Sequence, residues 1–246
     1  MCKIISIANQ KGGVGKSTTT IILADALVFK GYKVLVIDLD AQCNTSYAFN
    51  ALDTDLNVYT LLKGNSIEPI IQRHRGVDII PSSPLLSGAN MEFVSKGKES
   101  MLKDAIEPIL KHYDYILIDT APEVNILTIN ALIASTSVIV PTLTTTFAMQ
   151  GLKTLFENIQ VVQKINKGLK IEGLLLTRFN TRTIISRDLR GVILQMAKQM
   201  DTKIFKTAIH EGVAIQESQT QQESLLTYAP KAQVSKDYLN LAKELI

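Results

Sequence analysis

The chain has 246 residues, 46% of them hydrophobic and 20% charged, with a formal net charge of +3 at pH 7. This length is sufficient for one large α/β domain, and the composition is that of an ordinary soluble globular protein. No apolar run reaches the length of a membrane span, and the N-terminus lacks the basic and apolar regions of a signal peptide. Cys2 and Cys43 form no CxxC pair, which argues against a disulfide framework or a zinc site and fits a reducing cytoplasm.

Short apolar runs alternate with helical patterns along the whole chain. Because these runs are apolar on both faces, they are typical of central strands in a parallel sheet. Strands are expected at 3–8, 33–40, 77–81, 113–120, 135–142, 171–177 and 203–209. Helices are expected at 17–30, 98–111, 124–134, 147–166, 182–200 and 231–245. The alternation predicts an α/β fold, with a mostly parallel twisted sheet and helices on both faces, and we expect a single domain over 1–246.

A glycine-rich loop, "NQKGGVGKSTTT" at residues 9–20, connects the first expected strand to the first expected helix. Its glycines would let backbone N–H groups surround phosphate oxygens, and the helix start would add unpaired N–H groups. Lys16 would reach the β- and γ-phosphates, and the Ser17 hydroxyl would ligate Mg²⁺. The loop departs from the usual G-x-x-x-x-G-K-[ST] pattern, because Gln10 replaces the first glycine and Lys11 adds a second lysine. We interpret it as a variant P-loop.

Acidic residues end two of the expected strands. Asp119 closes the apolar run "YILID", where a Walker-B carboxylate would hold Mg²⁺ directly or through a water. Asp38 and Asp40 close the second strand, and Asp38 is expected to support the metal or an interface. Ligands of such sheets bind outside the carboxyl ends of the strands. We therefore expect the loop and these carboxylates to meet at one edge of the sheet.

Three motifs, "KGGVGKST", "VIDLDAQCNTS" and "YDYILIDTAPE", resemble in order and spacing those of the deviant Walker-A ATPases of the ParA/MinD group. The stretches "GLLLTRFNTRT" and "AQVSKDYLNLAKELI" resemble the ParA branch, which partitions plasmids and chromosomes. The resemblance covers the whole chain and implies ATP and Mg²⁺ as cofactors. The nucleotide-binding residues that it implies in the loop are Lys11, Gly12, Gly13, Val14, Gly15, Lys16, Ser17 and Thr18.

The resemblance also assigns a role to the extra lysine. In the family this lysine reaches across a dimer interface to the phosphates bound by the other subunit. A further cation acts most strongly where charge is concentrated and water is excluded, as with an arginine finger. Lys11 therefore predicts an ATP-dependent sandwich homodimer. Lys16 and Asp40 complete the expected catalytic set, because Asp40 matches the family residue that orients the attacking water.

Two segments depart from the family pattern. Many members have Pro-Gln-Gly after the second acid, whereas this chain has "AQC", so that Cys43 replaces a flexible glycine. Many partition ATPases have Pro-Arg-Asn-Val-Arg where this chain has "IHEGVAIQES". Glu211 and Ala214 thus stand in place of two arginines that bind DNA or shape the adenine pocket in the family. The adenine is then expected to contact Asn180, Ile209 and His210.

The 182–200 stretch offers a substitute surface for DNA. At about 100° per residue, it forms an amphipathic helix with a basic face and an apolar face. The basic face comprises Arg182, Arg187, Arg190 and Lys198. The apolar face comprises Ile185, Leu189, Val192, Ile193, Met196 and Met200. A solvated charged face would have the same pattern, but a basic face repeated in a dimer suits non-specific contact with DNA phosphates.

Together these interpretations predict a ParA-type ATPase for plasmid or chromosome partition. ATP and Mg²⁺ would drive dimerisation, and the dimer would bind DNA without sequence preference. A ParB-like centromere-binding partner would stimulate slow hydrolysis. The expected location is the cytoplasm, on the nucleoid, with no membrane partner.

Other functions fit parts of the pattern. A MinD-like membrane-cycling ATPase, or another cargo-positioning ATPase, would need a C-terminal amphipathic helix rich in Lys and bulky apolar residues. The ending "KDYLNLAKELI" instead has the short apolar stripe of a helix docked on the core. An iron–sulfur reductase would need paired cysteines. A nucleotide-regulated repressor of its own operon, with little turnover, stays open because the sequence gives no rate.

Overall fold

The computed structural model describes residues 2–51, 55–93, 95, 97–179 and 184–246, with the side chains of 146–150 and 184–190 outside the description. Its strands are β1 (Lys3–Ile7), β2 (Val34–Leu39), β3 (Gln72–His74), β4 (Val77–Ile80), β5 (Tyr115–Thr120), β6 (Ser137–Thr142) and β7 (Lys170–Leu176). They form one sheet in the order β3-β4-β2-β5-β1-β6-β7. Neighbouring strands are parallel except for β3 with β4. The α/β fold expected from the sequence is confirmed.

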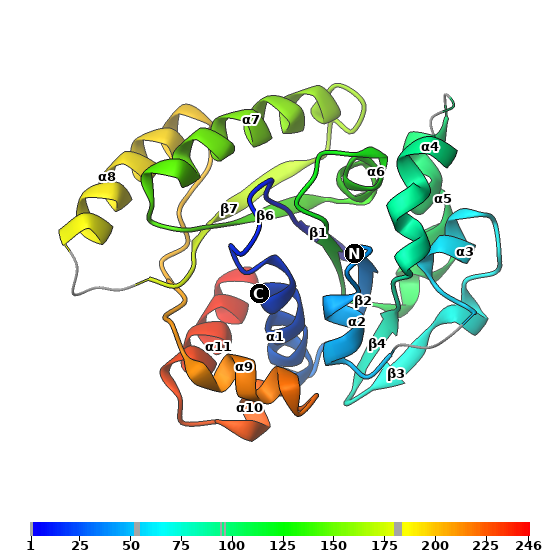
Figure 1. Ribbon diagram of the computed structural model, residues 1–246, viewed down its shortest axis with the longest axis horizontal. Helices are drawn as coiled ribbons and strands as arrows, with labels where there is room; N and C mark the ends of the chain where they lie inside the picture. Colours follow the sequence, from blue (N-terminus) through cyan, green and yellow to red (C-terminus); the bar gives the residue numbers. More distant parts are fainter. Residues whose placement is uncertain (1, 52–54, 94, 96, 180–183) are drawn as a thin grey trace.

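Helices cover both faces of this sheet (Figure 1). One face packs against α1 (Lys16–Phe29) and α11 (Gln233–Leu245). The other packs against α3 (Val58–Leu62), α5 (Met101–Ile106), α6 (Ile126–Ala134), α7 (Thr146–Gln163) and α8 (Ile184–Gln199). Shorter elements are α2 (Asn44–Ala48), α4 (Ala89–Glu92), α9 (Val213–Thr220), α10 (Leu225–Tyr228), η1 (Glu68–Ile70), η2 (Pro84–Gly88), η3 (Lys98–Ser100) and η4 (Glu107–His112).

The two-sided burial explains the unbroken apolar runs in the sequence. In β2, Val34 and Val36 pack on the α1 side, whereas Leu35 and Ile37 pack on the opposite side. Successive side chains of a strand point to opposite faces, so a central strand is mostly apolar on both of them. None of the helices that the described residues form combines the length and the apolar character that a membrane crossing requires.

The segment 203–209 was expected to be a strand, and this expectation is wrong. The segment runs beside β7 and contacts it at two separate places: an isolated bridge between Leu174 and Ile204, and a hydrogen bond from the Ile209 N–H to the Leu176 carbonyl at 2.8 Å. Between these contacts the backbone N–H groups of Lys206 and Thr207 donate instead to the Glu244 carboxylate of α11, at 2.9 and 2.7 Å. A ladder cannot form where the donors of the segment are already used by a helix side chain.

The expected helix over 98–111 is also interrupted. It is replaced by η3, α5 and η4 in succession. The break lies at Pro108, which has no backbone N–H and disfavours helical geometry at the residue before it. The C-terminal helix α11, in contrast, docks on the core as expected: Tyr238, Leu241 and Leu245 are buried in the cluster that includes α1.

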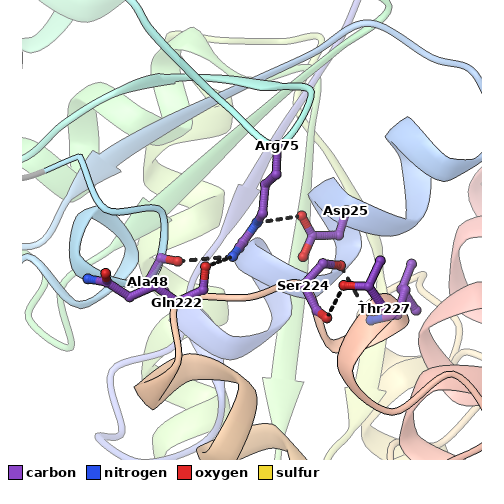
Figure 2. A network of polar contacts seen from close by, with 7 residues as sticks. Asp25, Ala48, Arg75, Gln222, Ser224 and Thr227 are labelled. Carbon is purple, nitrogen blue, oxygen red and sulfur yellow. Dashed lines mark hydrogen bonds and ion pairs between the residues drawn. The ribbon is translucent and has the colours of Figure 1, made fainter.

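A partly buried arginine joins segments that are distant in the sequence (Figure 2). Arg75 lies in the turn between β3 and β4, and its Nε donates to Asp25 Oδ1 of α1 at 3.1 Å. Its Nη1 donates to the carbonyls of Ala48 and Gln222, at 3.1 and 3.0 Å. The guanidinium also lies over the Phe49 ring, 4.2 Å from its centroid. One side chain thus holds α1, the end of α2 and the segment after α9 together.

We expect Arg75→Ala to lower the free energy of unfolding by about 3–5 kcal/mol, the usual effect of leaving one partner of a buried ion pair alone. Asp25 is only 3% exposed in its side chain, and burial raises its pKa against the opposing effect of Arg75. Urea unfolding measures the effect. Arg73→Ala is the matched control, because this arginine of the same hairpin is 76% exposed and an exposed ion pair contributes little. Equal losses in the two variants would contradict the prediction.

Candidate functional site

A cleft with a volume of about 970 Å³ opens beside the start of α1. Its walls come from the glycine-rich loop, the segment after β2, the end of β7, the segment 209–216 and α9. Most residues expected at the site line it: Gly12, Gly13, Gly15, Lys16, Ser17, Thr18, Asp40, Ile209 and His210. Lys11, Val14, Asp38 and Asp119 are not among its lining residues. Asn180 lies outside the described residues.

The glycine-rich loop is held by neighbouring strand ends. Asn9 donates to the Pro141 carbonyl at 2.6 Å and accepts from the Lys11 backbone N–H at 3.0 Å. On the other side the Thr177 hydroxyl, just after β7, donates to the Val14 carbonyl at 2.8 Å. Gly15 caps α1 with a φ of 87°, in the left-handed region that glycine adopts without strain. These contacts leave the N–H groups at the start of α1 available to a ligand.

The two lysines of the loop lie in different places. Lys16 is buried in the cleft, its Nζ is 3.4 Å from the Lys11 carbonyl, and burial lowers its pKa against the opposing effect of Asp119 and Asp40. The Lys11 side chain instead places its Nζ 3.5 Å from the Thr145 hydroxyl at an exposed position. Only Lys16 is therefore placed to meet a ligand bound to its own loop.

Two buried carboxylates stand side by side beneath the cleft. Asp38 and Asp119 occupy paired positions on the parallel strands β2 and β5. Burial raises the pKa of Asp119 to about 6, partly offset by the Thr45 and Ser17 hydroxyls. Burial and the charge of Asp119 raise the pKa of Asp38 to about 7. The site therefore favours a cation that would neutralise this pair.

The contacts of the two acids differ. Asp38 accepts from the backbone N–H groups of Asp40 and Ser46 and from the Ser46 hydroxyl, at 3.1, 2.8 and 2.7 Å. Asp119 Oδ2 accepts from the Thr45 hydroxyl at 2.7 Å, whereas its buried Oδ1 has no hydrogen-bond partner among the described residues. A buried oxygen without a partner is costly, so Asp119 fits a metal or its bound water. The contacts of Asp38 favour a role in fixing α2.

The donor set suits magnesium. The described residues contain no group of three or more His, Cys, Asp or Glu side chains that could hold a metal alone. Mg²⁺ is usually held by one or two carboxylates together with substrate phosphates and water. Asp119, with the Ser17 hydroxyl in the cleft wall, matches that requirement.

The segment after β2 carries the remaining acid. Asp40 lines the cleft with 7% of its surface exposed, and its Oδ1 accepts from the Gln42 N–H at 3.0 Å. Cys43 caps α2 with a φ of 55°, a left-handed conformation that glycine adopts more easily than a side-chain-bearing residue. This is the position at which the sequence has Cys43 in place of the glycine of the family pattern.

The expected DNA-binding residues are only partly described. Lys198 is exposed on α8, and Ile193 and Ala197 are buried on the opposite side. Val192, which was expected on the apolar face, is 39% exposed. Arg182 lies outside the described residues, as do the side chains of Arg187 and Arg190. The basic face of α8 therefore stays a prediction.

We expect the ligand-free protein to lose stability as the pH rises from about 4 to about 7. The pKa of Asp119 is raised to about 6 and that of Asp38 to about 7. The folded chain thus holds protons that the unfolded chain has already lost, and its free energy of unfolding falls with rising pH. Thermal unfolding over this range is the measurement. Asp38→Asn should flatten the dependence, and the exposed Asp201→Asn should not; equal slopes would contradict the prediction.

The fold and the loop define the class of protein. A glycine-rich loop between a parallel strand and a helix, with Lys16 in the cleft and Asp119 beneath it, is the arrangement of a P-loop NTPase.

Comparison with known proteins places the chain within that class. Residues 2–171 match the protein family described as AAA domain. The sporulation initiation inhibitor protein Soj of Bacillus subtilis is 36% identical over 259 residues, which cover 100% of this chain and 98% of Soj. The chromosome partitioning protein ParA of Myxococcus xanthus is 34% identical over 251 residues, which cover 99% of this chain and 88% of that protein. The chain belongs to the ParA family.

Solved structures agree with this placement. A putative plasmid partition protein of Borrelia burgdorferi, bound to AMPPNP, has a TM-score of 0.82 and 30% identity, covering 100% of this chain and 98% of that one. Cobyrinic acid a,c-diamide synthase of Mycobacterium smegmatis, with a bound ATP analogue and magnesium, has a TM-score of 0.86 and 29% identity. The match covers 100% of this chain and 94% of that one.

The sequence interpretation missed several residues of the site. Asn9, Thr45 and Thr177 hold the loop and Asp119, and Asp237 contacts His210. Asn9, Thr45 and Thr177 lie at or shortly after the ends of expected strands. A polar residue at such a position is the sequence signal that could have identified them. Asp237 had none, because its partner lies 27 positions away.

Proposed function

We propose that the protein is a ParA-type ATPase formed by a single domain over residues 1–246. The observation that carries this proposal is the buried Asp119 Oδ1, which has no partner among the described residues and lies beneath a cleft that holds Lys16. An inert glycine-rich turn would not need a buried lysine and an unpaired carboxylate oxygen together. A nucleotide with its metal would satisfy both.

The cofactors are ATP and Mg²⁺. Two similar structures were solved with ATP analogues, one of them with magnesium. In this chain the loop N–H groups and Lys16 would bind the phosphates, and Ser17 and Asp119 would hold the metal, which neutralises charge that develops on the phosphates. Asp40, in the cleft wall, would orient the attacking water.

Lys11 would act on a second copy of the chain. Its side chain lies outside the cleft, at an exposed position near Thr145. A lysine there adds nothing to the phosphates of its own subunit, but it suits an approach to those of a facing subunit. The proposed active form is therefore an ATP-dependent homodimer.

The names of the relatives support a role in partition. Soj and ParA span nearly the whole chain, and their names concern sporulation initiation and chromosome partitioning. The proposed dimer binds DNA without sequence preference, and the basic face of α8 is the proposed contact. A ParB-like partner stimulates hydrolysis, and the protein works in the cytoplasm on the nucleoid.

The test compares DNA retention with ATP and with ADP over a series of salt concentrations. Binding that depends on ATP, and that weakens steeply as salt rises, is expected for phosphate contacts made only by the dimer. ATPase rates with DNA and with a ParB-like partner complete the test. Equal retention with both nucleotides would contradict the switch, and hydrolysis that neither DNA nor partner changes would contradict the partition cycle.

A further inference from the structure

His210, in the wall of the cleft, is paired with a buried carboxylate. Its Nδ1 lies 2.8 Å from Asp237 Oδ2, and its backbone N–H donates to the same oxygen at 3.0 Å. The other oxygen of Asp237 accepts from the Gln233 amide at 2.8 Å. The Asp237 side chain is 5% exposed, whereas that of His210 is 35% exposed. Three donors thus fix the carboxylate, and the carboxylate fixes the imidazole.

This pairing determines which ring nitrogen carries the proton. A carboxylate oxygen only accepts hydrogen bonds, so Nδ1 must donate, and Nε2 of the neutral ring then keeps its lone pair. The two nitrogens point in diverging directions, so Nε2 is directed away from Asp237. His210 lines the cleft and Asp237 does not. Asp237 therefore fixes the ring of a residue of the cleft wall, and the nitrogen left to accept a hydrogen bond is Nε2.

The cleft has a charged end, lined by Lys16 and Asp40, and a mixed wall that carries His210. That wall contains the apolar residues Ile209, Val213 and Ile215 together with Glu211, which pairs with Arg178 at 2.9 Å. Phosphates and metal require Lys16 and Asp40, so the base of a bound nucleotide is left with the wall that carries His210. The Tyr238 hydroxyl lies 3.4 Å from that of Thr19, and this contact ties the helix of Asp237 to the helix that follows the loop.

We propose that His210, oriented by Asp237, selects nucleotides with a 6-aminopurine base by accepting a hydrogen bond from the 6-amino group. This inference rests on the proposed nucleotide site. An oxo group at position 6 would place an acceptor against the Nε2 lone pair of the neutral ring, and neither atom would have a donor. His210 is thus a specificity-determining residue, and Asp237 is a positioning residue that acts through it.

The test uses ATP and inosine triphosphate, which differ at position 6 of the base. Their affinities, in the presence of Mg²⁺, are measured by competition with a fluorescent ATP analogue. Wild-type protein is expected to favour ATP at least about tenfold, equivalent to about 1.4 kcal/mol. His210→Phe keeps a flat ring without nitrogen and should reduce that preference about fivefold, the scale of one hydrogen bond. Asp237→Ala should reduce it as well, because the ring loses its orientation.

His112→Phe is the matched control, since this histidine is exposed and does not line the cleft. It should keep the wild-type preference. An unchanged preference in His210→Phe would overturn the inference, and so would equal weakening for both nucleotides, because the ring would then only fill space. Wild-type protein that bound neither nucleotide would refute the proposed function instead. Thermal unfolding of each variant checks the fold, and if Asp237→Ala fails to fold, the His210→Phe comparison decides alone.

Discussion

Lys11→Ala is expected to abolish ATP-dependent dimerisation and to lower turnover about a thousandfold, the scale of an arginine finger supplied in trans. ATP binding by the monomer should change little. The reason is the position of the side chain, whose Nζ lies near the exposed Thr145 hydroxyl, while Lys16 alone of the two loop lysines lines the cleft. Sedimentation with a non-hydrolysable ATP analogue measures dimerisation, and a fluorescent analogue measures binding.

Substitutions of two other lysines serve as controls for this experiment. Lys16→Ala should lose nucleotide binding by the monomer itself, because the buried cation of the cleft is removed. Lys30→Ala, at the exposed C-terminal end of α1, should behave as wild type. If Lys11→Ala dimerised and hydrolysed ATP normally, the assignment of this lysine to a second subunit would be wrong.

Asp40→Asn is expected to slow hydrolysis about a hundredfold to ten-thousandfold, the range for a positioned acid–base group. Dimerisation should persist, so the ATP-bound dimer should accumulate. Asp40 lines the cleft and is 7% exposed, and asparagine retains an oxygen for the Gln42 N–H. The substitution therefore removes the charge with little change of shape. Phosphate release and sedimentation, measured on the same sample, separate turnover from assembly.

The control for Asp40 is the exposed Asp201→Asn, which removes a carboxylate away from the cleft. It should leave both measurements unchanged. A normal rate of phosphate release in Asp40→Asn would mean that another group orients the attacking water. A loss of dimerisation together with turnover would mean that Asp40 supports the interface instead.

The central part of the fold could be predicted because its signal is local. Runs such as 115–118 are apolar at every position, which is typical of a strand buried on both faces. The edge strand β3 was missed because it has three residues, Gln-Arg-His, none of them buried. The segment 203–209 has the composition of a strand, but the Glu244 carboxylate takes the backbone donors of Lys206 and Thr207 in its middle.

In the site, too, the residues of a continuous motif could be predicted, whereas those that depend on distant contacts could not. The phosphate loop is one continuous motif, so the sequence predicts its lysines, its glycines and its place at the edge of the sheet. Thr45 is buried against Asp119 and lies 74 positions from it, and Asp237 lies 27 positions from His210. A polar residue such as Thr45 near the end of a strand is visible in the sequence, but its partner depends on how β5 and α11 pack against distant segments, and no local pattern encodes that pairing. The sequence therefore reveals the residues of the phosphate loop more readily than the residues, such as Thr45 and Asp237, that position other side chains of the site.

Helix α2 has only five residues, and both of its ends are anchored. Thr45 and Ser46 bind the acids of β5 and β2, while the carbonyls of Tyr47 and Ala48 receive the Gln222 amide and the Arg75 guanidinium. The same short helix therefore links the two buried acids, through hydrogen bonds at its two ends, to the β3–β4 hairpin and to the segment after α9.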